Sequence, residues 1–368
     1  MYKIGIDGHM LGDHSGGNES YYSNILRSMK IPDNCEVYLF VKPGIDVSDY
    51  SDKYKIVRFK SKNAMRRNFW ELTVLCRKYG LDLLHTQYFI PFIRPCKTVC
   101  TIHDICFEHF KDIFTKKEYY RQKILIPYAA KHSDYIFTVS CHAKKDIVEH
   151  YKVSEETTVV TYNAVNNSFR VLTEQELNEE QLREKFQLGN EPYVLNVSNL
   201  QPRKNLVRLI KAFIAMKKKY GGTEKLVIVG KKAWMFDEIL KTALEGSDDI
   251  VFTDYVSEED LVRLYNAAAC FVYPSFFEGF GIPPLEAMAC GTPVAVAQAT
   301  SLPEVVGDAG LYFDPYSEDE IAESIHRMIT DAKLSGDLKE RGLLQAKKFS
   351  WAGSAKIIVD TYMKLLLK

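Results

Sequence analysis

The sequence has no apolar run long enough to span a bilayer. Its first residues, Met1–Asp7, are typical of a strand and not of the apolar segment of a secretory signal peptide. These two absences favour synthesis and residence in the cytoplasm. The alternative is a cytoplasmic protein that contacts the inner face of the membrane peripherally.

The sequence also lacks an excess of charge of either sign, because it has 48 basic residues (Lys and Arg) and 48 acidic residues (Asp and Glu). A dedicated nucleic-acid-binding protein normally carries a basic excess, so we expect no nucleic acid among the partners. The hydrophobic fraction of 46% and the charged fraction of 26% are those of an ordinary globular protein.

None of the 8 cysteines belongs to a CxxC pair. Scattered cysteines suit reduced thiols better than a disulfide framework. Cys96, Cys100 and Cys106 lie close to His103 along the chain, and a metal site there is one alternative. The apolar run Thr98–Ile102 predicts a buried strand at this place, which favours thiols within the core.

A chain of 368 residues is long for a single core, so two domains are expected. Short apolar runs alternate with helical patterns in both halves, which predicts two doubly wound α/β domains with parallel sheets. Two such domains facing each other make a cleft at the carboxyl ends of the strands. The polar residues 166–191 mark the boundary, which assigns 1–168 to the first domain and 189–350 to the second. The predicted strands are Tyr2–Ile6, Val37–Val41, Leu81–His85, Val99–Ile102, Tyr135–Val139, Tyr193–Val197, Lys225–Val229, Ile250–Phe252, Cys270–Tyr273 and Pro293–Val296.

The most informative segment is a glycine-rich loop between two glutamates. A predicted strand ends at Tyr273, and Pro283 and Pro284 are typical of the first turn of a helix. Small residues let a ligand approach the backbone, and a helix N-terminus presents N–H groups to an anion, so the segment suits a diphosphate. Glu278 before the helix and Glu286 in its first turn predict hydrogen bonds to sugar and ribose hydroxyls. The alternative is a solvated Glu278 and a Glu286 that only stabilises the helix dipole.

A second signal is the cation pair Arg203 and Lys204, which follows Ser198 and the first predicted strand of the second domain. Cations at the start of a helix oppose its dipole, so a bound anion explains them better. The alternative is a solvated pair in a surface loop. Together with the glutamate segment, the pair predicts phosphate binding.

Two weaker signals follow strands of the first domain. Ser15, Gly16 and Gly17 come after the first strand, where a glycine backbone suits a phosphate or an acceptor at the start of the next helix. A simple turn is the alternative. His103 and Asp104 come directly after another strand, and His103 is suited to bind a sugar hydroxyl or to assist proton movement. A structural histidine–aspartate pair is the alternative.

In combination, these motifs resemble the retaining nucleotide-sugar glycosyltransferases of the GT-B fold, in particular the mannosyltransferase-like members of glycosyltransferase family 4. The resemblance covers nearly the whole chain and implies that the second domain binds the nucleotide sugar while the first receives the acceptor. It also implies that a last helix, residues 351–368, crosses back to the first domain. The matching motifs are Glu278 to Glu286 with seven residues between them, Arg203-Lys204 after Ser198, His103-Asp104, Gly16-Gly17 and Val139-Ser140.

The same resemblance implies roles for single residues. Arg203 and Lys204 neutralise the diphosphate, and Glu286 binds the ribose hydroxyls. His103 contacts the sugar near its 6-position, and Gly17 contacts phosphate from the first domain. Glu278 and the backbone of residues 280–282 hold the sugar or phosphate, and Val256 borders the base. The implied catalytic set is Glu278, His103, Lys204 and Arg203, and the implied substrate-binding set is Gly16, Gly17, Asp104, Ser198, Val256, Phe280, Gly281, Ile282, Leu285 and Glu286.

Charge determines the chemistry that such a site must supply. Breaking the sugar–phosphate bond leaves negative charge on the diphosphate, which fixed cations and N–H groups stabilise. The sequence lacks a DxD motif, so we expect no metal and no other cofactor, with Arg203 and Lys204 in the place of a metal clamp. The resemblance implies retention of the anomeric configuration by front-face attack, in which a donor phosphate oxygen accepts the proton of the acceptor.

Ile6-Asp7-Gly8 and the region Thr101–Phe107 are most similar to bacterial mannosyltransferases that build surface polysaccharides. The expected donor is therefore GDP-mannose, and the expected acceptor is a glycan or a lipid-linked glycan. Uridine-diphosphate sugars are the alternative donors. An epimerase or phosphorylase of similar architecture, and a catalytically silent subunit that binds nucleotide or glycan, are the alternative functions.

Basic residues stand beside aromatic residues at two places in the first domain, which would suit contact with an anionic membrane and a lipid-linked acceptor. Solvated helix faces with buried aromatic side chains are the alternative. The basic residues are Lys60, Lys62, Arg66 and Arg67 before Phe69, Trp70 and Leu72, and Lys116 and Lys117 before Tyr119 and Tyr120.

Overall fold

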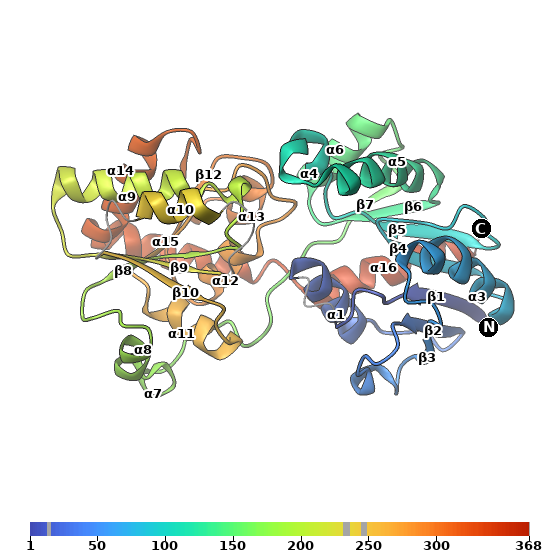
Figure 1. The fold of residues 1–368 in the computed structure, drawn as a ribbon. Coiled ribbons are helices and arrows are strands. Elements are labelled where there is room, and N and C mark those ends of the chain that lie inside the picture. The colour runs from blue at the N-terminus through green and yellow to red at the C-terminus, as the bar shows by residue number, and fades with distance from the viewer. Residues whose placement is uncertain (13–15, 231–235, 244–248, 368) are drawn as a thin grey trace. The chain divides into compact units, whose positions relative to one another are not determined.

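The computed structural model describes residues 1–12, 16–230, 236–243 and 249–367. The chain divides into two compact units, each with its own parallel sheet (Figure 1). Unit 1 consists of Met1–Asn163 and Ser350–Lys368, and unit 2 consists of Ala164–Phe349. The predicted fold class, two doubly wound α/β domains, is confirmed.

Unit 1 is built on a seven-stranded sheet in the order β3-β2-β1-β4-β5-β6-β7, and every pairing in it is parallel. The strand order changes direction between β1 and β4, which is where doubly wound sheets bind ligands. The central strands are buried on both faces, as their nearly continuous apolar runs predict. The strands are β1 (Tyr2–Asp7), β2 (Cys35–Val41), β3 (Lys55–Arg58), β4 (Leu83–Gln87), β5 (Lys97–Thr101), β6 (Tyr135–Thr138) and β7 (Thr158–Val160).

Helices cover both faces of this sheet. On one face, α5 and α6 pack over Cys100 and Ile136. On the other, α1 and α16 pack together, and His85 of β4 contacts Tyr362 of α16. The helical segments of unit 1 are α1 (Gly17–Ser28), η1 (Ser48–Tyr50), α2 (Ala64–Arg66), η2 (Arg67–Glu71), α3 (Leu72–Tyr79), α4 (Cys106–His109), η3 (Lys111–Ile113), α5 (Lys116–His132), α6 (Cys141–Tyr151) and α16 (Trp351–Leu366).

Helix α16 closes the chain and belongs to unit 1, although unit 2 separates it from the rest of that unit in sequence. The Ser350 hydroxyl caps its start by accepting a hydrogen bond from the backbone N–H of Gly353 at 3.3 Å. Ile358, Tyr362 and Leu365 recur at helical spacing and are buried, so one face of the helix completes the core of unit 1.

Unit 2 is built on a six-stranded parallel sheet in the order β10-β9-β8-β11-β12-β13. The direction of the strand order changes between β8 and β11. The strands are β8 (Tyr193–Val197), β9 (Lys225–Val229), β10 (Ile250–Asp254), β11 (Cys270–Tyr273), β12 (Val294–Ala297) and β13 (Gly310–Phe313). The helical segments are α7 (Glu174–Leu177), α8 (Glu179–Lys185), η4 (Pro202–Lys204), α9 (Leu206–Tyr220), α10 (Phe236–Ala243), α11 (Glu258–Ala267), α12 (Ile282–Ala289), α13 (Leu302–Val306), α14 (Glu318–Thr330) and α15 (Ala332–Ala346).

Residues 166–191, the predicted boundary between the domains, lie within unit 2. They form α7 and α8, which both contact α11. The buried Leu182 anchors α8, and Lys185 forms an ion pair with Asp260 at 2.8 Å. A polar segment can therefore belong to a domain when a few of its residues pack against that domain.

Over the described ranges of the chain, no helix combines the length and the apolar character that crossing a bilayer requires.

Candidate functional site

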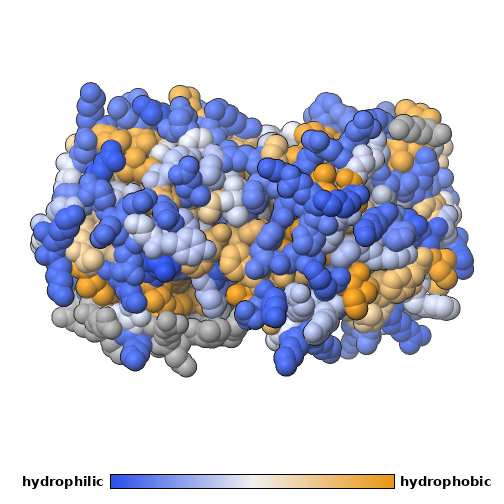
Figure 2. Space-filling view, turned by 90° about the horizontal axis from the view of Figure 1, so that it is seen from above, coloured by the Kyte–Doolittle hydropathy of each residue, from blue (hydrophilic) through white to orange (hydrophobic). Residues whose placement is uncertain are grey.

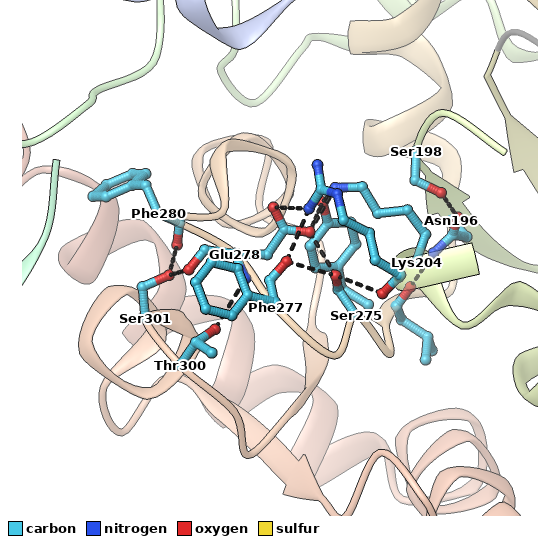
Figure 3. Close-up of polar contacts among 12 residues, drawn as sticks. Asn196, Ser198, Lys204, Ser275, Phe277, Glu278, Phe280, Thr300 and Ser301 are labelled. Carbon is cyan, nitrogen blue, oxygen red and sulfur yellow. Dashed lines mark hydrogen bonds and ion pairs between the residues drawn. The ribbon is translucent and has the colours of Figure 1, made fainter. Parts of the chain in front are cut away.

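The carboxyl ends of β8 and β11 carry a connected set of polar side chains (Figure 3). These two strands are neighbours at the place where the strand order of the sheet changes direction. Segment η4 follows β8 and brings Arg203 and Lys204, and the loop after β11 brings Glu278. The sheet thus joins Lys204 to Glu278 across 74 residues of sequence.

The Glu278 carboxylate lies at the centre of this set. Its Oε1 accepts hydrogen bonds from Lys204 Nζ at 2.5 Å, Ser275 Oγ at 2.6 Å and the Tyr273 hydroxyl at 3.0 Å. Its Oε2 lies 3.2 Å from Nη1 of Arg203. Burial raises the pKa of Glu278, but the charges of Lys204 and Arg203 outweigh burial and lower the pKa to about 2. The cluster therefore contains two cations and one carboxylate, with one positive charge in excess.

Hydrogen bonds between the two loops hold the cations in place. The Phe276 N–H donates to the Arg203 carbonyl at 2.9 Å, and Nη1 of Arg203 donates to the Phe277 carbonyl at 2.8 Å. Asn205, with a left-handed φ of 59°, donates its side-chain amide to the Pro274 carbonyl at 3.1 Å. Both cations are thus positioned by the loop that also carries the glutamate.

Helix α12 begins where this loop ends. Its N-cap, Gly281, has a φ of 103°, and a Cβ there would lie 2.7 Å from the side chain of Leu302. Only glycine satisfies both conditions. Pro283 and Pro284 have no N–H, so Gly281 and Ile282 carry the backbone donors at the helix start, where an anion binds well.

Two hydroxyls after β12 hold the backbone of the Glu278 loop. Oγ1 of Thr300 accepts a hydrogen bond from the Glu278 N–H at 3.0 Å. Oγ of the buried Ser301 lies 2.9 Å from the carbonyl of Glu278 and 2.8 Å from that of Phe280, and its hydroxyl donates to either. The geometry of the loop therefore depends on a third strand end as well as on its own residues.

Glu286 lies in the second turn of α12 and not in the first, because the helix begins at Ile282 and Glu286 is its fifth residue. Its carboxyl group accepts a hydrogen bond from the Tyr265 hydroxyl at 2.9 Å. Burial raises the pKa of Glu286 to about 7. Glu286 therefore changes its charge near neutral pH, whereas Glu278, in the loop before α12, stays ionised.

The remaining predicted residues of unit 2 differ in their surroundings. Oγ of Ser198 donates to Oδ1 of Asn196 at 2.9 Å, and the Asn196 amide donates to the Val272 carbonyl at 2.8 Å. Ser198 therefore takes part in the connection between β8 and β11. Val256 follows β10, two strands away from β8, and Leu285 is fully buried in the core of the unit.

His103 lies in unit 1, just after β5, and only 5% of it is exposed. Its Nε2 contacts the side-chain amide of Gln87, and its ring meets the Tyr21 ring edge to face, with centroids 4.8 Å apart. Burial lowers the pKa of His103 to about 3, so the imidazole is neutral at physiological pH. Such a group can exchange hydrogen bonds with a hydroxyl but supplies no positive charge.

Asp104 and the two glycines complete the predicted set of unit 1. Oδ1 of Asp104 accepts a hydrogen bond from the Cys106 N–H at 3.0 Å, which supports the start of α4. Gly16 caps α1 with a φ of 75°, and Gly17 is the first residue of that helix. A Cβ on Gly16 would have no atom within 4 Å. Ser15 lies outside the described residues.

The structure also shows hydrogen-bond partners of Glu278 and His103 that the sequence did not reveal. Tyr273, Ser275 and Thr300 all bind Glu278, and Gln87 binds His103. Each follows or ends a strand at the carboxyl edge of its sheet, and this position is the signal that could have indicated them. Tyr and Ser are too common at such positions for residue type alone to mark them.

Across residues 1–12, 16–230, 236–243 and 249–367, no group of three or more His, Cys, Asp or Glu side chains is placed to hold a metal ion. Cys100 and Cys106 are buried and Cys96 is partly buried, and none of the three is in a disulfide. Two cations beside one carboxylate suit an anionic ligand better than a metal ion.

Comparison with known proteins agrees with this geometry. The family described as Glycosyltransferase Family 4 matches residues 15–169, and the family described as Glycosyl transferases group 1 matches residues 178–345. Sucrose-phosphate synthase from Thermosynechococcus elongatus superimposes with a TM-score of 0.76 over 100% of both chains at 19% identity, which shows the shared fold. The two parallel sheets show the GT-B fold, and together with the two family matches they define the class of protein as a glycosyltransferase of that fold.

Relatives by sequence define the family more closely. The chain is 34% identical to O-antigen chain mannosyltransferase B of Escherichia coli over 310 residues, which are 82% of this chain and 78% of that protein. It is 30% identical to the serotype-specific mannosyltransferase WbdA of Escherichia coli over 280 residues, or 74% of this chain, but spans only 34% of WbdA. The chain belongs to glycosyltransferase family 4, group 1, and it is a glycosyltransferase.

Proposed function

We propose that this glycosyltransferase transfers mannose from GDP-mannose, with retention of anomeric configuration, to a glycan or lipid-linked acceptor in surface polysaccharide synthesis at the cytoplasmic side of the membrane. The observation that carries the proposal is the cluster of Arg203, Lys204 and Glu278 beside the start of α12. The names of the two relatives, an O-antigen chain mannosyltransferase and a serotype-specific mannosyltransferase, support mannose as the sugar and a surface polysaccharide as the product.

The excess positive charge of the cluster suits a diphosphate. Arg203 and Lys204 bind its oxygens, and the N–H groups of Gly281 and Ile282 add donors that need no reorganisation. As the sugar–phosphate bond breaks, negative charge grows on the diphosphate and these groups stabilise it. The cluster does this without a metal ion.

Glu278 has two tasks in this scheme. Its Oε1 accepts a hydrogen bond from Lys204 Nζ at 2.5 Å, and its ionised carboxylate also accepts a hydrogen bond from a sugar hydroxyl of the donor. The neutral imidazole of His103 in unit 1 is suited to exchange hydrogen bonds with a sugar hydroxyl. A donor phosphate oxygen takes the proton of the acceptor during front-face attack, so no side chain of the protein acts as a nucleophile. The anomeric configuration of the product, read by nuclear magnetic resonance, tests retention.

Thermal shift without added metal tests the donor. We expect GDP and GDP-mannose to raise the melting temperature, because a ligand that binds only the native state stabilises it, by about 2.7 kcal/mol at a hundredfold excess over Kd. UDP, UDP-glucose and UDP-N-acetylglucosamine should leave it unchanged. Stabilisation by the uridine ligands alone would contradict the assignment of GDP-mannose as the donor. If no nucleotide stabilised the protein, the proposed nucleotide-sugar site itself would be contradicted.

The affinity for GDP-mannose should rise with pH. Glu286 is proposed to accept hydrogen bonds from the ribose hydroxyls as a carboxylate, and with its pKa at about 7 it is mostly protonated at pH 6 and mostly ionised at pH 8. The association constant should therefore increase about tenfold over that interval, since the ionised fraction increases by that factor. Each phosphate of GDP-mannose has one ester bond, one anhydride bond and one strongly acidic oxygen, so neither phosphate titrates between pH 6 and pH 8. Calorimetric titration at several pH values measures the effect.

Replacement of Glu286 by Gln should abolish this pH dependence. The matched control is Glu340→Gln on the exposed face of α15, which should keep the wild-type profile. A flat affinity in the wild-type protein would show that the Glu286 carboxylate does not bind the donor.

A further inference from the structure

Most of the exposed large apolar side chains of unit 1 lie on three segments: the region from α2 to α3, the loop 91–95 and helix α5. Seen from the side on which α5 lies, apolar side chains interrupt the hydrophilic surface of this unit at several places (Figure 2). We call the following set the apolar patch. It consists of Met65, Trp70, Val74, Phe92, Ile93, Tyr120 and Ile124, each of which is between 46% and 67% exposed.

Direct contacts join the three segments. The Phe92 ring stacks on Phe69 of η2, with centroids 4.6 Å apart, and meets Tyr128 of α5 edge to face at 5.1 Å. Thr73 Oγ1 of α3 donates to the Ile93 carbonyl at 2.8 Å. Loop 91–95 thus bridges α3 and α5, and the exposed residues on each side of it belong to one continuous surface.

The local helix geometry explains which aromatic side chains point outward. Segment η2 is a π-helical turn, which changes the helical register and is frequent at functional sites. It leaves Phe69 partly buried against Phe92 while Trp70 is 65% exposed. On α5, Tyr120 and Ile124 are four residues apart and share one face with Tyr128. Buried aromatics therefore do not account for this surface, because Tyr120 is 62% exposed.

Positive charge surrounds the apolar patch. Residues 60–78 contain six basic side chains, of which Arg67 is buried, and one acidic one. Residues 111–131 contain six basic side chains, of which Lys123 forms an ion pair with Glu108, and two acidic ones, in a chain whose net charge is zero. Two of the three acids are engaged locally. Glu71 accepts a hydrogen bond from the Ser61 N–H at 3.0 Å, and Glu118 closes a capping box with Thr115 at the start of α5. The excess of cations is thus a property of this surface and not of the whole protein.

We propose that the apolar patch and its basic surroundings dock unit 1 on the surface of an anionic lipid bilayer. Trp and Tyr side chains favour the headgroup level, where an apolar ring and a polar group are both accommodated, and cations pair with lipid phosphates. The proposal deepens the function proposed above, because a lipid-linked acceptor lies in such a surface. The docking surface contains none of the residues assigned to the donor, so it can be tested without turnover.

Co-sedimentation of the full chain with vesicles tests the proposal. At about 50 mM salt the protein should pellet with vesicles of phosphatidylglycerol and phosphatidylcholine, and much less with phosphatidylcholine alone. Raising the salt to about 0.5 M should weaken the binding. Lys116→Glu/Lys117→Glu should lower the partition coefficient at least about 25-fold, since each surface cation contributes roughly fivefold. Trp70→Ser/Ile124→Ser should also lower it.

The matched controls lie in unit 2. Leu344→Ser and Lys347→Glu/Lys348→Glu replace equally exposed residues in and after α15 and should bind vesicles like the wild type. The patch variants should keep the wild-type melting temperature and its increase with GDP-mannose, which separates docking from the donor site. Absence of binding to anionic vesicles at low salt would overturn the proposal, as would an equal loss in the unit 2 controls. A patch variant that alters only self-association in sedimentation velocity would contradict it as well.

Discussion

Replacing Lys204 by Ala should lower turnover by about a thousandfold, because the variant loses a buried cation beside the proposed site of the leaving diphosphate. Removal of one donor that stabilises developing charge typically costs about a hundredfold to a thousandfold in rate, and a charged donor belongs at the upper end. Lys204 is 7% exposed, and its Nζ also donates to the Tyr273 hydroxyl at 2.7 Å. Steady-state kinetics with GDP-mannose and an acceptor extract measures the loss.

The control for this experiment is Lys211→Ala, which removes an exposed lysine of α9 and should leave turnover unchanged. Glu278 keeps Arg203, Ser275 and Tyr273 as partners in the Lys204 variant, so we expect it to fold, and circular dichroism checks this. Turnover within tenfold of the wild type in a folded Lys204→Ala protein would contradict the role of this lysine in catalysis.

Replacing Gly230 by Ala should destabilise unit 2 by about 2–3 kcal/mol, the usual cost of forcing extra atoms into a packed site. A Cβ on Gly230 would lie 1.9 Å from the carbonyl oxygen of Ser198 and 2.7 Å from its carbonyl carbon. Both are backbone atoms and cannot move without displacing the end of β8. The hydrogen bond from the Ser198 hydroxyl to Oδ1 of Asn196 depends on the position of that strand end. The affinity for nucleotide should therefore fall together with the melting temperature.

Gly336→Ala is the matched control for Gly230→Ala. Gly336 lies in α15, and a Cβ there would meet no atom within 4 Å. This substitution should raise stability by about 0.5–1 kcal/mol, because alanine loses less conformational entropy than glycine in a helix. Differential scanning calorimetry distinguishes the two variants, and an unchanged melting temperature for Gly230→Ala would show that β8 and β9 are less tightly joined than the structure indicates.

The central strands of both sheets were predictable from the sequence. All ten predicted strands occur, because buried parallel strands have continuous apolar runs that need no tertiary context. The predictions missed β3, β7 and β13, which lie at the edges of the sheets. Edge strands are only partly buried, as in β3, where no residue is fully buried, so their sequences lack the apolar run.

The sequence also indicated the segments that make up the candidate site. Glycine, proline and charged residues after predicted strands pointed to Arg203, Lys204 and Glu278. The prediction that Glu286 lies in the first turn of its helix was wrong, because the helix already begins at Ile282, just after its N-cap Gly281, and Glu286 is its fifth residue. Roles for these residues in catalysis stay predictions until the variants are measured.

The sequence by itself determined the alternation of strands and helices, the family and the segments that follow each strand, because these depend on short-range patterns. Only the tertiary structure decided that Glu278 joins both cations, that its pKa is low while that of Glu286 is raised, and that Trp70 is exposed. The order of the strands brings Lys204 into contact with Glu278, although 74 residues separate them in sequence. Burial and neighbouring charge, which set the pKa values and the exposed surface, exist only once distant segments have packed.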